Sequence, residues 1–244
     1  MRSTLITRFD HGPMPEPLIL SWSGGKDSTL ALDALRASGR HDPIVLLTSV
    51  TAGYERVSIH GVRRELLRAQ AAALGLPLHE FELQPESSND AYDAALAAAL
   101  EEVRGRCGAR RVAFGDLYLE DVRRYREQGV AALGFEPVFP LWGRDTAALA
   151  REFVDRGFQA RLVCVDTTQL PASFAGRAYD ARLLADLPAG VDPCGENGEF
   201  HTFVGGGPGF AVPVEYEVGE VVMRMERFAY CDLVPAGAAV SPSS

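Results

Sequence analysis

A short apolar run that leads into a glycine turn places the strongest constraint on the fold of this 244-residue chain. Leu18, Ile19 and Leu20 follow Pro17 and suit a strand that is buried on both faces of a parallel sheet. The next segment, SGGKDS at residues 23–28, contains two glycines, which let backbone amides approach an anion closely. A helix begins there, and its N-terminus adds positive partial charge beside the turn. The segment therefore predicts a strand, a loop and a helix that together bind a polyphosphate.

The spacing of this loop excludes two common nucleotide-binding patterns. A Walker A loop needs a glycine five positions before its Gly-Lys pair and Ser or Thr after the lysine, where this chain has Leu20 and Asp27. The dinucleotide pattern GxGxxG lacks its third glycine here. Lys26 is also the only lysine of the chain, against 23 arginines, and its compact ammonium suits a tight glycine turn better than a planar guanidinium does. The alternative is that the turn only connects a strand to a helix.

Strand and helix patterns alternate along most of the chain. Strands are predicted at residues 17–21, 44–50, 77–83, 111–114, 137–140 and 161–165. Helices are predicted at residues 28–37, 62–74, 89–104, 119–133 and 146–156. This alternation is typical of an α/β protein with a doubly wound parallel sheet, which binds ligands at the carboxyl ends of its strands. Residues 212–234 predict a terminal β-hairpin instead.

Three acidic residues outside the loop are candidates for catalysis. Asp116 follows the predicted strand 111–114, so it would lie at the edge of the sheet where ligands bind. Glu196 and Glu199 share a loop with several glycines, and a carboxylate is costly to bury unless an amine, an ammonium ion or a metal lies beside it. We therefore expect these three residues to join Lys26 as catalytic groups.

Charge and cysteine content indicate a compact enzyme of a reducing compartment. The net charge is −9, with 33 acidic and 24 basic residues, which disfavours nucleic acid as a partner. The four cysteines are scattered without a CxxC pair, which argues against a zinc site and a disulfide framework. No basic N-terminal region precedes a long apolar stretch, so neither secretion nor membrane insertion is expected. We expect a cytoplasmic protein, and the sequence leaves a homodimer open.

Five stretches resemble the diphthine–ammonia ligase family, also called N-type ATP pyrophosphatases. The SGGKDS segment is similar to the pyrophosphatase loop (PP-loop) of the adenine nucleotide alpha-hydrolase superfamily. The others follow in the family's order: SIHG at 58–61, FGD at 114–116 with Arg123 and Glu127 behind it, PLW at 140–142, and CGENGEFHTF at 194–203. The last resembles the family's C-terminal signature, Cys-Gly-Glu-x-Gly-Glu-aromatic-x-Thr-Phe. Together the stretches cover nearly everything from residue 18 to residue 210.

This resemblance implies a fold and a domain organisation. The fold would be a doubly wound parallel sheet of the adenine nucleotide alpha-hydrolase (HUP, Rossmann-like) type with a smaller C-terminal lobe. The expected parts are an N-terminal leader at 1–16, an ATP pyrophosphatase domain at 17–142, an acceptor-binding subdomain at 143–234 and a disordered tail at 235–244.

The resemblance also implies an ATP-dependent, amide-forming ligase. A carboxylate acceptor, small or protein-borne, would attack the α-phosphate of Mg²⁺-bound ATP, pyrophosphate would leave, and ammonia would then displace AMP. ATP and Mg²⁺ are the implied cofactors. In the family the acceptor is diphthine on elongation factor 2. Bacteria do not make diphthamide, and the composition suits a GC-rich bacterium, in which another carboxylate would serve as the acceptor.

Residues that match the family's motifs receive their expected roles from it. Lys26 would contact the β and γ phosphates, and Asp27 would bind Mg²⁺ or cap the helix. The ATP site would consist of Ser23, Gly24, Gly25, Lys26, Asp27 and Ser28. The acceptor site would consist of His60, Arg123, Glu127, Gly195, Asn197, Gly198, His201 and Thr202.

Two positions of the expected acceptor site depart from the family's eukaryotic members. Tyr125 stands where those members carry a second arginine, and His201 stands where they carry glutamate. Both departures lie in the expected acceptor site, so they affect the prediction of the acceptor more than the prediction that the protein uses ATP.

Two other functions remain open at this point. A tRNA-thiolating or lysidine-forming enzyme can carry the same loop, but it calls for a basic surface and paired catalytic cysteines, which this sequence does not show. A non-catalytic adenine-nucleotide-binding module is the second alternative, and turnover of ATP by the purified protein would exclude it.

Overall fold

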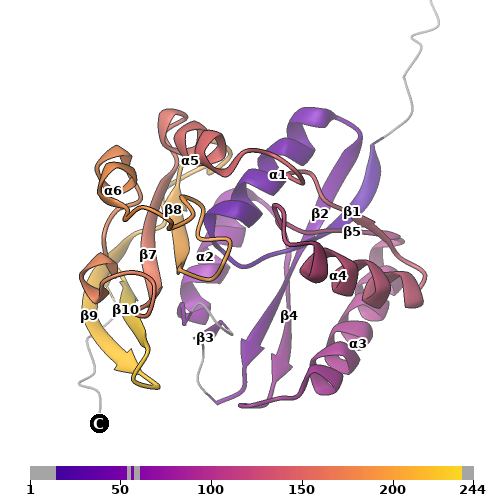
Figure 1. Ribbon diagram of the computed structural model, residues 1–244. Helices are drawn as coiled ribbons and strands as arrows, with labels where there is room; N and C mark the ends of the chain where they lie inside the picture. Colours follow the sequence, from indigo (N-terminus) through magenta and orange to yellow (C-terminus); the bar gives the residue numbers. More distant parts are fainter. Residues whose placement is uncertain (1–14, 54–55, 58–60, 238–244) are drawn as a thin grey trace, which may run out of the picture.

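The computed structural model describes residues 15–53, 56–57 and 61–237. Two β-sheets lie side by side in it, one built by the first part of the chain and one by the last part (Figure 1). We refer to them as sheet A and sheet B. Residues 1–14 of the expected leader, His60 and residues 238–244 of the expected tail lie outside the described residues.

Sheet A confirms the predicted α/β fold. Its strands are β1 (Glu16–Ser21), β2 (His41–Thr51), β3 (Arg56–Val57), β4 (Leu78–Leu83), β5 (Arg111–Ala113) and β6 (Glu136–Val138). They are ordered β3-β2-β1-β5-β6, and β4 also pairs with β2. Every pairing is parallel except that of the short β3 with the end of β2.

Helices cover both faces of sheet A, as the alternation predicts. They are α1 (Lys26–Ser38), α2 (Arg64–Leu74), α3 (Asn89–Cys107) and α4 (Glu120–Ala132). Leu18 and Leu20 of β1 pack in one core cluster with α1 and α2, whereas Ile19 packs in the other with α3 and α4. All three side chains are fully buried, so a continuous apolar run is what β1 requires.

Sheet B forms the smaller C-terminal lobe. Its strands are β7 (Gln159–Asp166), β8 (Phe200–Gly206), β9 (Tyr216–Arg224) and β10 (Phe228–Pro235), in the order β8-β7-β10-β9 with every pairing antiparallel. The helices of this part are α5 (Thr146–Asp155), the 3₁₀ turn η1 (Ala172–Phe174) and α6 (Ala181–Asp186). The β9–β10 pair confirms the hairpin predicted at residues 212–234.

Two sequence-based expectations need correction here. The strand predicted at 161–165 was expected to continue the parallel sheet, but it is β7, between β8 and β10 in sheet B. The spacing of apolar residues reveals a strand without revealing its partners. Residues 235 and 236 were expected in the disordered tail, but Pro235 pairs with Tyr216 and the Ala236 amide donates to the Glu215 carbonyl.

The two sheets share one hydrophobic core. A single cluster of buried residues includes Leu18 and Leu30 beside sheet A, Phe153 of α5, and Phe203 of β8. The shared core holds β8 next to the start of α1, so the C-terminal lobe contributes to whatever binds at the phosphate loop. None of the helices in the described part of the chain has the length and hydrophobicity needed to cross a membrane.

Candidate functional site

The phosphate loop lies at the carboxyl end of β1 and depends on its glycines. Gly24 has a φ of +76°, in the left-handed region. A Cβ atom at this position would lie 2.6 Å from Leu67 Cδ2 and 2.7 Å from Gln70 Oε1. Strain and lack of space therefore both require glycine. Gly25 is the N-cap of α1, so Asp27 does not cap this helix.

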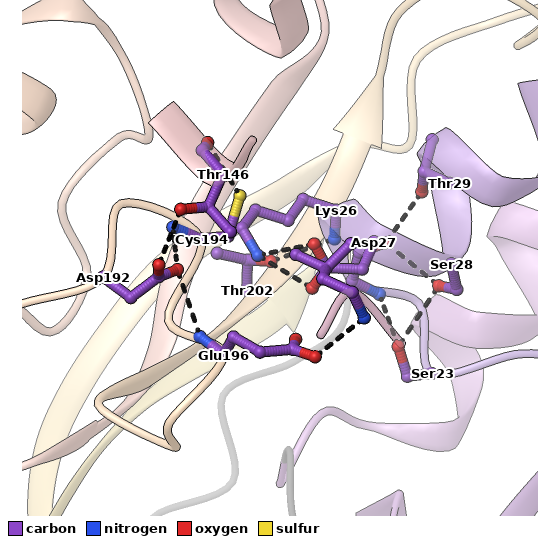
Figure 2. A network of polar contacts seen from close by, with 12 residues as sticks. Ser23, Lys26, Asp27, Ser28, Thr29, Thr146, Asp192, Cys194, Glu196 and Thr202 are labelled. Carbon is purple, nitrogen blue, oxygen red and sulfur yellow. Dashed lines mark hydrogen bonds and ion pairs between the residues drawn. The ribbon is translucent and has the colours of Figure 1, made fainter. Parts of the chain in front are cut away.

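Lys26 is a buried, charged side chain at the first position of α1. It is 2% exposed, and its Nζ donates to Asp27 Oδ1 at 2.8 Å and to Oδ2 at 2.7 Å. Burial by itself would lower the pKa of Lys26, but the Asp27 carboxylate outweighs it and the pKa is raised. Figure 2 shows the ammonium between the loop and the C-terminal signature. A permanent cation thus stands at the site where phosphates are expected.

The C-terminal signature is joined directly to the phosphate loop. The Lys26 amide donates to Thr202 Oγ1 at 3.0 Å, and the Val204 amide donates to the Gly24 carbonyl at 2.9 Å. A Cβ atom on Gly25 would lie 3.0 Å from the Thr202 carbonyl oxygen. The sequence separation of the two motifs favoured a distinct acceptor site in the C-terminal part. The structure instead places both motifs in one site.

Gln70 of α2 ties these parts together, and no sequence motif pointed to it. Its side chain is fully buried. Its Nε2 donates to the carbonyls of Gly24, at 2.9 Å, and Val204, at 2.6 Å, while its Oε1 accepts from Trp22 Nε1 at 3.2 Å. One amide side chain therefore connects the loop, β8 and the residue after β1. The only sequence signal was a polar residue within the apolar face of a predicted helix.

Glu196 reaches the loop from the signature. Its Oε1 accepts from the Leu117 amide at 2.8 Å. Burial raises the pKa of Glu196 to about 7, with smaller contributions from the charges of Asp27 and Asp116, although Lys26 opposes the shift. A carboxyl group with this pKa exchanges a proton near neutral pH.

Asp192, another residue without a sequence prediction, holds the loop that carries Glu196. Its Oδ1 accepts from the Cys194 amide at 2.8 Å, and its Oδ2 accepts from Thr146 Oγ1 at 2.7 Å (Figure 2). These bonds attach the signature to the start of α5 and orient Glu196 toward Lys26.

Asp116 follows β5, as predicted, and faces a cation that was not predicted. Its Oδ2 lies 3.4 Å from Nε of Arg126, which is on α4. Both atoms are buried, and neither has a hydrogen-bond partner among the described residues. The Arg126 guanidinium lies over the Phe114 ring, 4.9 Å from its centroid.

A cavity of about 890 Å³ brings most of the predicted residues together. Its lining includes Ser23, Gly25, Lys26, Asp27, Ser28, Asp116, Gly195, Glu196, Gly198, His201 and Thr202. Burial, with help from Lys26, lowers the pKa of His201 to about 4, so this imidazole is neutral at pH 7. The cavity extends past the ends of β2 and β4 to α3 and α4, which gives room for more than a triphosphate.

Five predicted residues of the described chain do not line this cavity: Gly24, Arg123, Glu127, Asn197 and Glu199. Glu199 is 1% exposed and accepts from the Asp192 amide at 2.9 Å and from the Asn197 amide at 2.9 Å. These contacts place Glu199 and Asn197 inside their own loop. Backbone amides therefore bind the Glu199 carboxylate, in place of the expected amine, ammonium ion or metal. Arg123 pairs with Glu127 at 2.6 Å and stacks on the Trp142 ring, away from the loop.

The donor groups suit Mg²⁺ that arrives with a nucleotide. The described residues contain no group of three or more His, Cys, Asp or Glu side chains that could hold a metal ion. Mg²⁺ commonly uses one or two carboxylates together with phosphate oxygens and water. Lys26 occupies both oxygens of Asp27, whereas Asp116 Oδ2 has no hydrogen bond and only a longer ion pair of 3.4 Å to Arg126, so Asp116 is the better placed ligand.

Comparison with known proteins identifies the family. Residues 17–137 match the diphthamide synthase N-terminal domain, and residues 145–233 match the diphthamide synthase C-terminal domain. The chain belongs to the diphthamide synthase family. It is 28% identical over 228 residues to a zebrafish (Danio rerio) diphthine–ammonia ligase, with 84% of this chain and 88% of the relative covered. The human diphthine–ammonia ligase is 27% identical over 231 residues, with 83% of each chain covered.

A more distant likeness concerns a solved structure. Phosphoadenylyl-sulfate reductase from Candida auris, in a phosphate complex, is 15% identical and covers 59% of this chain and 73% of its own. The TM-score is 0.34, which is too low to bear on fold or function.

The Gln70 clamp of this diphthamide synthase family member gives a first prediction. Gln70→Met keeps the length of the side chain but cannot donate to the Gly24 and Val204 carbonyls. We expect it to lower the free energy of unfolding by about 1–3 kcal/mol, the usual cost of leaving a buried polar group without its partner. Affinity for ATP should fall as well, because the loop loses its support.

Trp22→Phe is the comparison variant: it removes the indole donor to Gln70 Oε1 and part of a buried ring, but it leaves both bonds from Gln70 Nε2 in place. Chemical denaturation and ATP titration of both variants measure the effects. Equal losses in the two variants, or an unchanged ATP affinity in Gln70→Met, would contradict a clamp on the loop.

Proposed function

We propose that this protein is an ATP-dependent ligase that converts the carboxylate of a diphthine-type acceptor into an amide with ammonia. One observation carries the proposal: the phosphate loop and the C-terminal signature form a single cavity around the buried ammonium of Lys26. Family membership and the relatives named diphthine–ammonia ligase support the choice of reaction. The acceptor and the products remain proposals.

The first step is adenylation of the acceptor. A carboxylate oxygen attacks the α-phosphorus of ATP, the bond from that phosphorus to the β-bridging oxygen breaks, and pyrophosphate leaves with the bonding electrons. The N-terminus of α1 and the Lys26 ammonium would stabilise the charge that develops on the leaving group. Bound Mg²⁺ would neutralise part of the phosphate charge, and Asp116 would hold it on the protein side.

The second step forms the amide. The nitrogen of ammonia attacks the acyl carbon, the bond from that carbon to the AMP oxygen breaks, and AMP leaves. The nitrogen must lose one proton as the new bond forms, and a carboxylate with a pKa near 7 can accept it. Glu196, held by the Leu117 amide beside Lys26, has that property.

The cysteines give no support to a thiolating enzyme. Cys164, Cys194 and Cys231 are buried. Burial raises the pKa of Cys194, the cysteine of the signature, to about 12, so it is a thiol rather than a nucleophilic thiolate at neutral pH.

Product analysis tests the proposed function. Purified protein is incubated with ATP, Mg²⁺, ammonium and elongation factor 2 that carries diphthine, and both nucleotides and the modified residue are followed by mass spectrometry. We expect AMP, pyrophosphate and an amide in equal amounts. Release of ADP and orthophosphate alone would contradict the proposal, as would an unmodified acceptor.

Lys26 should be essential for turnover but not for folding, because its side chain lines the cavity rather than the hydrophobic core. Lys26→Ala should lower turnover roughly 10²–10³-fold, the usual loss when one preorganised charge stabiliser is removed. Lys26→Arg should also be impaired, since a planar fork cannot replace a compact ammonium beside Asp27. Steady-state pyrophosphate release measures both, and circular dichroism checks the fold. Full activity in the arginine variant would show that the lone lysine is an accident of composition.

Glu196 should set the pH dependence of amide formation. The carboxylate form is the active base, so the rate at constant free ammonia should rise with pH through about 7 and then level off. Glu196→Gln keeps an acceptor for the Leu117 amide but cannot take a proton. It should lower the rate about 10²-fold and flatten the profile, with ATP affinity changed less than about threefold. A variant that keeps the wild-type profile would assign the base to another group.

A further inference from the structure

The cavity has a second cation, Arg126, which comes from α4 rather than from the phosphate loop. Among the described lining residues, Lys26 and Arg126 are the two with a permanent positive charge. The carboxylates of the lining outnumber them and are Asp27, Glu86, Asp116, Asp121 and Glu196. Lys26 is committed to the loop, where both Asp27 oxygens hold its ammonium. Any further anion in this acidic cavity therefore depends on Arg126 for attraction.

Arg126 is firmly positioned and still able to donate. It comes from α4, which packs on the opposite face of sheet A from α1. Its guanidinium rests on the Phe114 ring, interacts with Tyr92 and forms an ion pair with Asp116, in which the separation of 3.4 Å between Nε and Oδ2 is long for a hydrogen bond. Its buried Nε has no hydrogen-bond partner among the described residues. A buried donor without a partner is costly, which favours a ligand that supplies the acceptor atom.

The geometry of the proposed adenylation tells which ligand group belongs there. In a phosphoryl or nucleotidyl transfer, the attacking and leaving oxygens lie roughly in line on opposite sides of phosphorus. The leaving pyrophosphate points toward the loop and Lys26, so the attacking carboxylate must approach from the other side of the cavity. Arg126 is the other permanent cation of the described cavity lining, and it comes from α4, on the opposite face of sheet A from α1.

We propose that Arg126 binds the carboxylate of the acceptor and orients it toward the α-phosphate, an inference that rests on the proposed ligase function. The planar guanidinium fork matches a carboxylate in a way that an ammonium cannot. Arg126 thereby takes the role that the sequence motif assigned to Arg123. Arg123 cannot fill it in this arrangement, because it is paired with Glu127 and stacked on Trp142 outside the cavity.

The test compares four variants with elongation factor 2 carrying diphthine as the acceptor probe. Arg126→Gln removes the charge, and Arg126→Lys keeps the charge without the fork. Arg124→Gln is the control, since Arg124 is an exposed arginine of the same helix that does not line the cavity. Arg123→Gln tests the competing assignment. Kinetics give KM and kcat for the acceptor, calorimetry gives the affinity for ATP, and thermal unfolding verifies the fold.

Arg126→Gln should raise the acceptor KM about 10–100-fold, the range for loss of a hydrogen bond to a charged group. Its ATP affinity should stay within about twofold of wild type. Arg126→Lys should recover only part of the loss, and Arg124→Gln should behave as wild type.

Three results would overturn the inference, and a fourth would remove its basis. An unchanged acceptor KM in folded Arg126→Gln would show that this residue does not bind the acceptor. An equal loss of ATP affinity would assign it to the nucleotide. A raised KM in Arg123→Gln alone would restore the assignment from the motif. Wild-type protein that forms no amide on the probe would remove the proposed function itself, which the wild-type reaction shows before any variant is compared.

Discussion

The attachment of the phosphate loop to strand β8 is the interaction on which the rest of the site depends. The Gly24 carbonyl accepts from both the Val204 amide and Gln70, and the Lys26 amide donates to Thr202 Oγ1. These bonds are buried, so they are shielded from competing water and hold their geometry closely. Because β8 begins directly after the signature loop, the same bonds bring Glu196 to Lys26. The two sheets thus meet at the atoms that would do the chemistry.

Charge is distributed in the cavity to suit a reaction between two anions. Asp27, Asp116 and Glu196 lie near one another, and two cations, Lys26 and Arg126, line the same cavity. Crowded, buried carboxylates are unfavourable in the charged form, which explains the raised pKa of Glu196. The same crowding would repel a triphosphate and an acceptor carboxylate unless Mg²⁺ and the two cations compensated it. Under the proposed function, the acidic cavity wall would favour a metal-bound nucleotide over a free one.

The two positions at which this chain departs from the family's eukaryotic members both line the cavity. His201 lies in the cavity wall, where burial keeps its imidazole neutral, so it cannot replace the charge of a glutamate. Tyr125 also lines the cavity, beside Arg126, which is one position further along the same helix. Arg123 and Arg126 are three residues apart, so their side chains differ in direction by roughly 60° around α4. Of the two, only Arg126 lines the cavity.

The sequence by itself determined the local elements and the nature of the loop. Apolar spacing gave β1 and the helices around it, and the two glycines with Lys26 identified a phosphate site, because these features depend on neighbouring residues. Only the tertiary structure decided which distant groups meet. It placed β7 in the second sheet and turned the Glu199 side chain into its own loop. Arg126 lines the cavity where Arg123 was expected. Gln70 holds the phosphate loop, and Asp192 holds the signature loop. The physical reason is that strand partners and side-chain contacts between remote segments are set by packing of the shared core, which no local pattern records.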